Sequence, residues 1–246
     1  MINTNATTSM MKFSFILGFV VLLFINHFQC YKADEETEPA PTCQKYECPP
    51  YISIHKDEEF EIRLYNHTIW MSTSEIASTS FKDATKEGFL KLLDYVKGDN
   101  KEEQKVPMTA PAVTDVILFS GSPSCYNSSF AIRLPIPTQF QDSPPAAMDD
   151  MELHPQVFNS HCTAVRTFGG FTTDQNVKDE AKKLKATLVG TPWGTLLRSN
   201  FSNECLSKDD PPVFTVAQYN SPFENVSRVN EIWFTLEDSK GTMCSI

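Results

Sequence analysis

The distribution of hydrophobic residues along the chain predicts a series of short strands interrupted by two helices. Between Phe60 and Tyr65, apolar and polar side chains alternate, which is the two-residue period of a strand with one buried face. Further strand-like segments follow along the chain: Ile69–Met71, Val113–Phe119, Phe130–Ile136, Val157–Phe168, Phe214–Tyr219 and Ile232–Leu236.

Two segments instead show the three- and four-residue spacing of an amphipathic helix. The first runs from Phe81 to Val96; Ser80 before it is a suitable N-cap, and Gly98 stands where a helix stop belongs. In the second, Thr173 is the expected cap and Gly190 the expected stop. Its apolar positions are Val177, Ala181, Leu184 and Leu188.

The order of these elements repeats. A strand–helix–strand–strand unit covers about residues 51–136, a second covers about 151–237, and a proline-rich connection from Ile136 to Pro145 joins them. Two such units predict an α+β fold in which about eight strands close into one β-barrel with two flanking helices. A barrel of this size has a small interior, so a large ligand is expected at a mouth or in a cleft between helix and sheet.

The N-terminal region predicts export. The apolar run from Phe13 to Phe28 is short and follows Lys12, as in a signal peptide, so residues 1–30 are expected to be removed by cleavage after Cys30 or Ala33. An uncleaved membrane anchor is the alternative. Residues 31–50 are expected to be an acidic, proline-rich arm that is a linker or only loosely tied. The folded domain is expected over 51–238, with a C-terminal tail at 239–246.

Glycosylation sequons and cysteines support an extracellular location. Four sequons follow the leader, at Asn66, Asn127, Asn200 and Asn225. An even set of six cysteines also remains after it, which predicts disulfides whose pairing is left open: Cys43, Cys48, Cys125, Cys162, Cys205 and Cys244. A zinc site is the weaker reading, because no Cys-x2-Cys pair is present.

Charge and missing motifs narrow the function. Without residues 1–30 the chain has 20 basic and 31 acidic residues, a net charge of −11. It has no basic stripe, which disfavours nucleic acid and anionic membrane surfaces as partners, and no stable membrane association is expected after leader cleavage. The sequence contains no nucleophile elbow, phosphate loop or His-Glu-x-x-His motif, so the prediction is a protein that is not an enzyme.

Several segments, in this order and spacing, resemble the SOUL or haem-binding protein family. They are Glu61–Tyr65, Trp70 with Ser72-Thr73, the helix at Gly88-Phe89, Met108–Pro111, the connection from Ile136 to Pro145, Phe168–Gly170, and the tail from Tyr219 to Trp233. The resemblance covers about residues 51–236. It implies a distorted β-barrel built from two repeats and a binding site for haem or another tetrapyrrole, with haem as ligand and not as catalytic cofactor.

The resemblance also implies where the ligand binds, namely along the first helix. The implied contact residues are Phe81, Thr85, Phe89 and Leu92, with Lys86 near a propionate. Two family features are missing: Asp94 stands where a cation is implied, and Leu64 replaces a histidine suggested as an axial iron ligand. The expectation is therefore micromolar haem binding without a strong protein-supplied axial nitrogen, and no protein metal ligand is assigned.

Two hypotheses follow from the sequence. The first is a secreted carrier or scavenger that holds haem or a related tetrapyrrole non-covalently in an apolar cleft beside the first helix. The second is an extracellular disulfide-bonded glycoprotein whose barrel no longer binds haem and serves protein–protein interaction with an unknown partner. The changes at Leu64 and Asp94 keep the second hypothesis open.

Overall fold

The computed structural model describes residues 40–118, 128–197, 213–221, 227–237 and 244. The chain divides into two compact units, Met1–Thr37 and Glu38–Ile246, and the described residues all belong to the second. Its strands are β1 (Tyr51–Lys56), β2 (Glu61–Tyr65), β3 (Thr68–Thr73), β4 (Ile76–Ser78), β5 (Ala112–Leu118), β6 (Ser128–Pro135), β7 (Leu153–Phe158), β8 (His161–Gly169), β9 (Phe214–Gln218) and β10 (Val229–Leu236).

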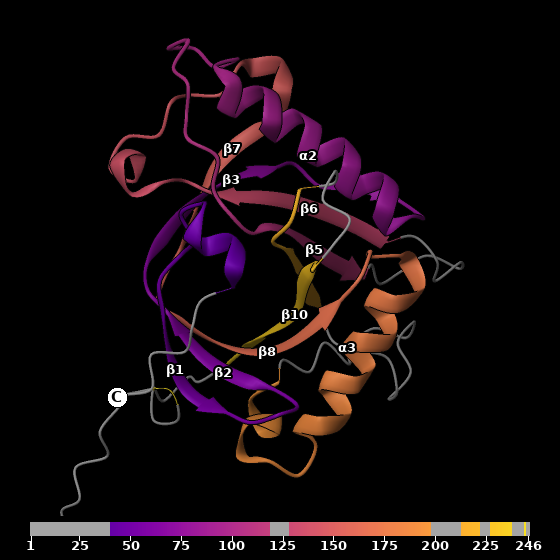
Figure 1. The fold of residues 1–246 in the computed structure, drawn as a ribbon. Coiled ribbons are helices and arrows are strands. Elements are labelled where there is room, and N and C mark those ends of the chain that lie inside the picture. The colour runs from indigo at the N-terminus through magenta and orange to yellow at the C-terminus, as the bar shows by residue number, and fades with distance from the viewer. Residues whose placement is uncertain (1–39, 119–127, 198–212, 222–226, 238–243, 245–246) are drawn as a thin grey trace, which may run out of the picture. The chain divides into compact units, whose positions relative to one another are not determined.

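The strands form a single curled antiparallel sheet (Figure 1). Its order is β1-β2-β8-β10-β9-β5-β6-β3-β7, with β4 paired to β6. The two halves of the chain therefore meet three times inside the sheet, where β2 pairs with β8, β5 pairs with β9 and β3 pairs with β7. The sheet confirms the expected α+β distorted barrel, in the form of a curled half-barrel whose end strands β1 and β7 do not pair within the described residues.

Two α-helices flank the sheet on one side, as expected. Helix α2 (Phe81–Lys97) packs on β6 and neighbouring strands, and α3 (Asp174–Leu188) packs on β10 and β8 (Figure 1). Within the described residues, four 3-10 turns complete the elements: η1 (Pro41–Gln44), η2 (Thr138–Phe140), η3 (Asp149–Met151) and η4 (Pro192–Leu196). Among the helices of the described residues, none has the length and apolar content needed to cross a membrane.

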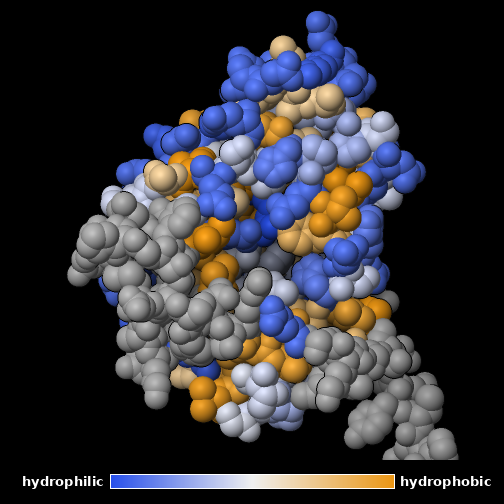
Figure 2. Space-filling view, turned by 180° about the vertical axis from the view of Figure 1, so that it is seen from behind, coloured by the Kyte–Doolittle hydropathy of each residue, from blue (hydrophilic) through white to orange (hydrophobic). Residues whose placement is uncertain are grey.

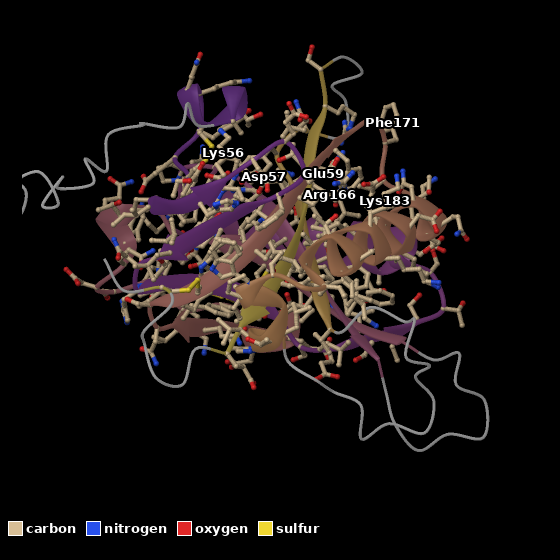
Figure 3. All side chains as sticks on the ribbon, turned by 90° about the horizontal axis from the view of Figure 1, so that it is seen from below. Lys56, Asp57, Glu59, Arg166, Phe171 and Lys183 are labelled. Atoms are coloured by element: carbon tan, nitrogen blue, oxygen red, sulfur yellow. A yellow bond between two sulfur atoms is a disulfide. The ribbon has the colours of Figure 1, made fainter. Side chains whose placement is uncertain are left out.

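Both helices begin and end where the sequence predicted. The Ser80 hydroxyl oxygen accepts a hydrogen bond from the Asp83 amide at 3.2 Å, and Gly98 adopts the left-handed conformation that ends α2. The Thr173 side chain forms a capping box with Asn176 at the start of α3. The Arg166 guanidinium on β8 forms ion pairs with Glu180 of α3 at 2.9 Å and with Glu59 at 2.8 Å (Figure 3). The pair with Glu180 connects the helix to the sheet.

Each strand presents alternate residues to two faces of the sheet. The outer face lies under the helices and forms the main core, with buried residues such as Ile132, Ile232 and Phe234. The inner face is the opposite side, where a second cluster gathers around Tyr65, Trp233 and neighbouring aromatic residues. Because the sheet curls, this inner face surrounds the middle of the ring of strands in Figure 1.

Some strand predictions were wrong in number or extent. The sheet has ten strands instead of about eight, because β1 and β4 were not predicted as strands. The segment Val157–Phe168 is not one strand: a turn divides it between β7 and β8. Each half therefore has more than one strand before its helix, and the predicted strand–helix–strand–strand unit is only the central part of each half.

The described part of the N-terminal arm is held against the sheet more firmly than expected. A disulfide joins Cys43 to Cys48, and the Glu47 carbonyl accepts a hydrogen bond from the Ala110 amide at 3.0 Å. The Glu47 carboxylate accepts a second bond, from the Thr138 amide, at 2.7 Å. Side chains of the arm pack on the inner-face cluster, so residues 40–50 belong to the folded domain.

Gly88 sets how closely α2 approaches the sheet. A Cβ atom at this position meets side-chain atoms of Ile132 at 2.7 Å, and Ile132 is fully buried. We expect Gly88→Ala to lower the free energy of unfolding by about 1–3 kcal/mol, the usual cost of overpacking a core. Urea unfolding measures this. The exposed change Lys86→Ala on the same helix is the control, and equal stability of the two variants contradicts the close approach.

Candidate functional site

Helix α2 has one face inside the core. Its buried residues include Phe81, with 3% of its surface exposed, and Leu92, which is fully buried. Both pack in the outer-face core, so little of either side chain is open to a ligand. The remaining three predicted ligand contacts, Thr85, Lys86 and Phe89, lie outside the buried face.

These three belong to a partly exposed strip that we term the α2 flank. It consists of Lys82, Thr85, Lys86, Phe89 and Leu93, which follow one another at helical spacings of three and four residues. Thr85, Phe89 and Leu93 are half-buried, whereas the two lysines are exposed. The flank thus combines an apolar strip with a cationic rim.

The flank faces the neighbouring strand β5 and the second helix. The hydroxyl groups of Thr85 and Thr114 on β5 are 3.0 Å apart and share a hydrogen bond. A crevice near the N-terminal ends of both helices has a cavity volume of only about 10 Å³, and its lining residues are Thr79, Phe81, Val116, Phe130, Asp174, Val177, Lys178 and Phe214. This volume holds little more than one water molecule, so a flat ligand of porphyrin size does not fit inside the crevice.

The positive charge of the flank comes from its lysines and not from the helix N-terminus. The Asp174 carboxylate already accepts hydrogen bonds from the amides of Phe81 at 2.5 Å and Lys82 at 3.4 Å. The side chains of Lys82 and Lys86, in contrast, have no ion pair with another described residue. They are therefore available to a ligand carboxylate.

Asp94 does not oppose this arrangement. Its carboxylate pairs with Lys97 at 3.5 Å. At 100° per residue, Asp94 lies about 140° around the helix axis from Phe89. The predicted repulsion between Asp94 and a propionate is therefore weak for a ligand on the flank.

The histidines of the described ranges lie away from the α2 flank. His55, His154 and His161 belong to β1, β7 and β8, and His67 lies in the turn between β2 and β3. His161 is largely buried, which lowers its pKa. Within the described ranges, no group of three or more metal-ligating side chains is arranged to hold an ion. Leu64 lies on β2 and pairs with Cys162, so the position at which a histidine was suggested is remote from α2.

The inner face holds a buried ionic network that the sequence did not predict. The Arg63 guanidinium donates to Glu61 Oε2 at 2.7 Å and to Glu231 Oε1 at 2.9 Å. Glu231 Oε2 also accepts from the Tyr219 hydroxyl at 2.9 Å and from Trp233 Nε1 at 2.7 Å. Burial lowers the pKa of Arg63, but Glu231, Tyr65, Tyr219 and Glu61 together outweigh this effect and raise the pKa above the ordinary arginine value. The charged residues Glu61 and Arg63 within the strand were the available signal in the sequence. Glu231, the second partner of Arg63, lies 168 residues away along the chain.

A second ion pair lies on the same face. Arg133 on β6 pairs with Asp115 on β5, and the Thr215 hydroxyl donates to the same Asp115 oxygen at 2.5 Å. The Arg133 guanidinium also lies 4.3 Å from the centre of the Phe158 ring. The inner face therefore carries three carboxylates and two guanidiniums beside aromatic rings.

The structure describes part of the predicted covalent features. It pairs Cys43 with Cys48 and Cys162 with Cys244, which confirms four of the six predicted disulfide cysteines. Of the sequons, Asn66 is exposed in the turn between β2 and β3. The rest of the predicted features lie outside the described residues: Cys125, Cys205, Asn127, Asn200 and Asn225.

Comparison with known proteins identifies the class. The family model described as SOUL heme-binding protein matches residues 46–235, and the chain belongs to this family. Heme-binding protein 2 of Homo sapiens is 32% identical over 71% of this chain and 76% of its own length. Heme-binding protein 1 of Xenopus tropicalis is 28% identical over 71% of this chain and 82% of its own. Among solved structures, the EcmrR C-terminal domain is similar with a TM-score of 0.46 and 11% identity, over 73% of this chain and 97% of that one.

Proposed function

We propose that this protein binds haem or a related tetrapyrrole non-covalently on the α2 flank. Membership of the SOUL haem-binding family carries the proposal. The flank supports it, since Phe89 and Leu93 offer an apolar strip to a flat ring while Lys82 and Lys86 can meet its two propionates. The family is a binding family, so the proposed role is binding and not catalysis.

The flank fits the organic part of haem better than its iron. Apolar surface buried against the ring contributes roughly 25 cal/mol per Å², and two charge pairs at the rim add specificity. No histidine lies on α2, so this helix supplies no axial imidazole to the iron. The proposed complex is therefore of micromolar affinity, and the ring itself, not the metal, is its main recognition element.

Reversing the charge of one lysine tests the proposed propionate contacts at the rim of the flank. Lys86→Glu is expected to weaken haem binding by about 1–2 kcal/mol, because a partly exposed attraction to a propionate becomes a repulsion. Lys82→Glu is expected to have a similar effect, and the double change a larger one. The measurement is a titration followed in the Soret region.

The matched control is Lys97→Glu, which makes the same charge change at the far end of α2, where Lys97 pairs with Asp94. This control separates a local contact from the overall effect of a net charge of −10. Equal weakening in the Lys97 and Lys86 variants contradicts a propionate contact at Lys86. If the wild-type protein shows no saturable Soret change, the alternative of a ligand-free glycoprotein that binds a protein partner is favoured.

We also propose that the protein is secreted, with its leader removed near residue 30 and glycans on more than one of the four sequons. The support is the apolar run after Lys12, the sequons, and the disulfides at Cys43 and Cys162. Expression of the full chain in secreting eukaryotic cells tests this. The expected results are a mature N-terminus near residue 31 and a mobility shift after glycosidase treatment; secreted material that starts at Met1 contradicts the cleavage.

A further inference from the structure

The inner face of the sheet is separate from the α2 flank. Thr114 on β5 faces outward and bonds Thr85 of α2, whereas its neighbour Asp115 faces inward and pairs with Arg133. Any ligand of the inner face is therefore divided from the flank by the thickness of the sheet. The inner face needs its own explanation, because soluble proteins rarely place this many charges in a buried position.

Three buried polar atoms on this face have no hydrogen-bond partner among the described residues. They are Glu61 Oε1, Thr163 Oγ1 and Arg133 Nε. Glu61 is 7% exposed and Thr163 only 1%, and Thr163 pairs in register with Arg63, which binds Glu61. Buried polar groups in native proteins almost always have a partner. A donor from outside the described residues is therefore expected beside Glu61 and Thr163, which lie on the adjacent strands β2 and β8.

The charge of the face indicates what kind of donor this is. Among the described residues of this face, the carboxylates of Glu61, Glu231 and Asp115 face two guanidiniums, those of Arg63 and Arg133, which is an excess of one negative charge. The Arg63 side chain is saturated, because its three nitrogens already bond carboxylates or Tyr65. An uncompensated buried carboxylate is costly, so a bound cation stabilises the face.

Aromatic rings next to these carboxylates favour an organic cation over a metal ion. The rings of Tyr51 and Tyr65 are 5.4 Å apart between centres, and those of Tyr65 and Trp233 are 5.3 Å apart. Aromatic faces attract cations and stack on flat rings. Figure 2 shows a hollow near the middle of the molecular face, with strongly hydrophilic residues at its bottom and hydrophobic ones around it. This hollow lies behind the centre of the ring of strands in Figure 1.

We propose that the inner face of the curled sheet is a second binding site, for a small planar aromatic cation of the amidinium or ammonium class. The N–H groups of the cation donate to Glu61 Oε1 and Thr163 Oγ1, and its ring lies against Tyr65 and Trp233, because the Arg63 guanidinium already lies 4.2 Å from the centre of the Tyr51 ring. Arg63 positions both carboxylates and does not itself contact the ligand. The site is independent of haem binding on the α2 flank.

Benzamidine, a planar aromatic amidinium, is the probe, and the experiment is calorimetric titration of the intact mature protein. Benzamide has nearly the same shape without the charge, and benzoate has the opposite charge. The expected result is that benzamidine binds at least about tenfold more tightly than benzamide or benzoate. A tenfold difference in affinity is what one charge-assisted hydrogen bond contributes. Absence of benzamidine binding, or equal binding of benzamide, overturns the proposal, and neither comparison requires a variant to fold.

Glu61→Gln then locates the site. It keeps the shape of the side chain but removes its charge, and it is expected to weaken benzamidine binding about tenfold while haem binding stays unchanged. Lys86→Glu on the α2 flank is the reciprocal control, expected to weaken haem binding and leave benzamidine binding unchanged. Unaltered benzamidine affinity in a folded Glu61→Gln protein contradicts this location. Failure of haem binding alone leaves the benzamidine result interpretable, because the two sites are on opposite faces.

Discussion

Replacing Arg63 by methionine is expected to lower the free energy of unfolding by about 3–5 kcal/mol. Methionine fills most of the volume of the arginine stem, so the loss comes from charge. Without the guanidinium, the carboxylates of Glu61 and Glu231 lie buried on one face with no cation between them. Such orphaned charges cost much more than an exposed ion pair contributes. Urea unfolding at neutral pH measures the effect.

Arg166→Met is the matched control for this experiment. Arg166 also contacts two carboxylates, those of Glu59 and Glu180, but at the edge of the sheet, where Glu59 is largely exposed (Figure 3). Its loss is expected to cost about 1 kcal/mol or less. Adding Glu61→Gln and Glu231→Gln to the Arg63 variant should restore part of the stability, because the unpaired charges are then removed. Equal losses for the Arg63 and Arg166 variants contradict the account of the inner-face network.

Leu92→Ala is expected to cost about 2–5 kcal/mol of stability and to leave haem affinity unchanged. Leu92 is fully buried under α2, so its truncation leaves a cavity in the core and no change on the flank. The half-buried Leu93 is the matched control on the next position of the helix. Leu93→Ala is expected to cost less stability and to weaken haem binding. Thermal unfolding and the Soret titration, run on both variants, give the two readouts.

The opposite pattern contradicts the division of α2 into a core face and a ligand-binding flank. If Leu92→Ala weakens haem binding in a protein that remains folded, the ligand reaches the core side of the helix. If Leu93→Ala leaves haem binding unchanged, the flank is not the contact surface. Phe89→Ala provides a further check, because Phe89 is the aromatic residue of the flank.

Local patterns predicted the helices well, since their signals lie within a few residues of one another. The caps at Ser80 and Thr173 and the stop at Gly98 depend on neighbouring backbone groups only. Strands were harder to predict. The three-residue β4 (Ile76–Ser78) is too short for a visible period, and its partner β6 is about fifty residues away along the chain. Pairing of this kind depends on tertiary contacts that no short window contains.

The candidate sites show the same difference between local patterns, which the sequence reveals, and tertiary contacts, which it does not. Helical spacing placed Phe81, Thr85, Phe89 and Leu92 near one side of α2, but it did not show where the sheet ends and the solvent begins. The structure assigns Phe81 and Leu92 to the core and leaves Thr85 and Phe89 on the flank. The inner-face network was not predicted, because Glu231 becomes a neighbour of Arg63 only when β10, β8 and β2 lie together in the sheet.

Paramagnetic broadening by ferric haem tests the central claim most directly. In amide correlation spectra of isotope-labelled protein, bound ferric haem broadens the signals of nearby residues, while zinc protoporphyrin, a diamagnetic analogue, does not. We expect selective loss of the signals of α2 from Lys82 to Leu93, with those of Arg63 and Glu231 on the inner face retained. Broadening centred on β2 and β10, or spread evenly over the protein, contradicts a haem site on the α2 flank.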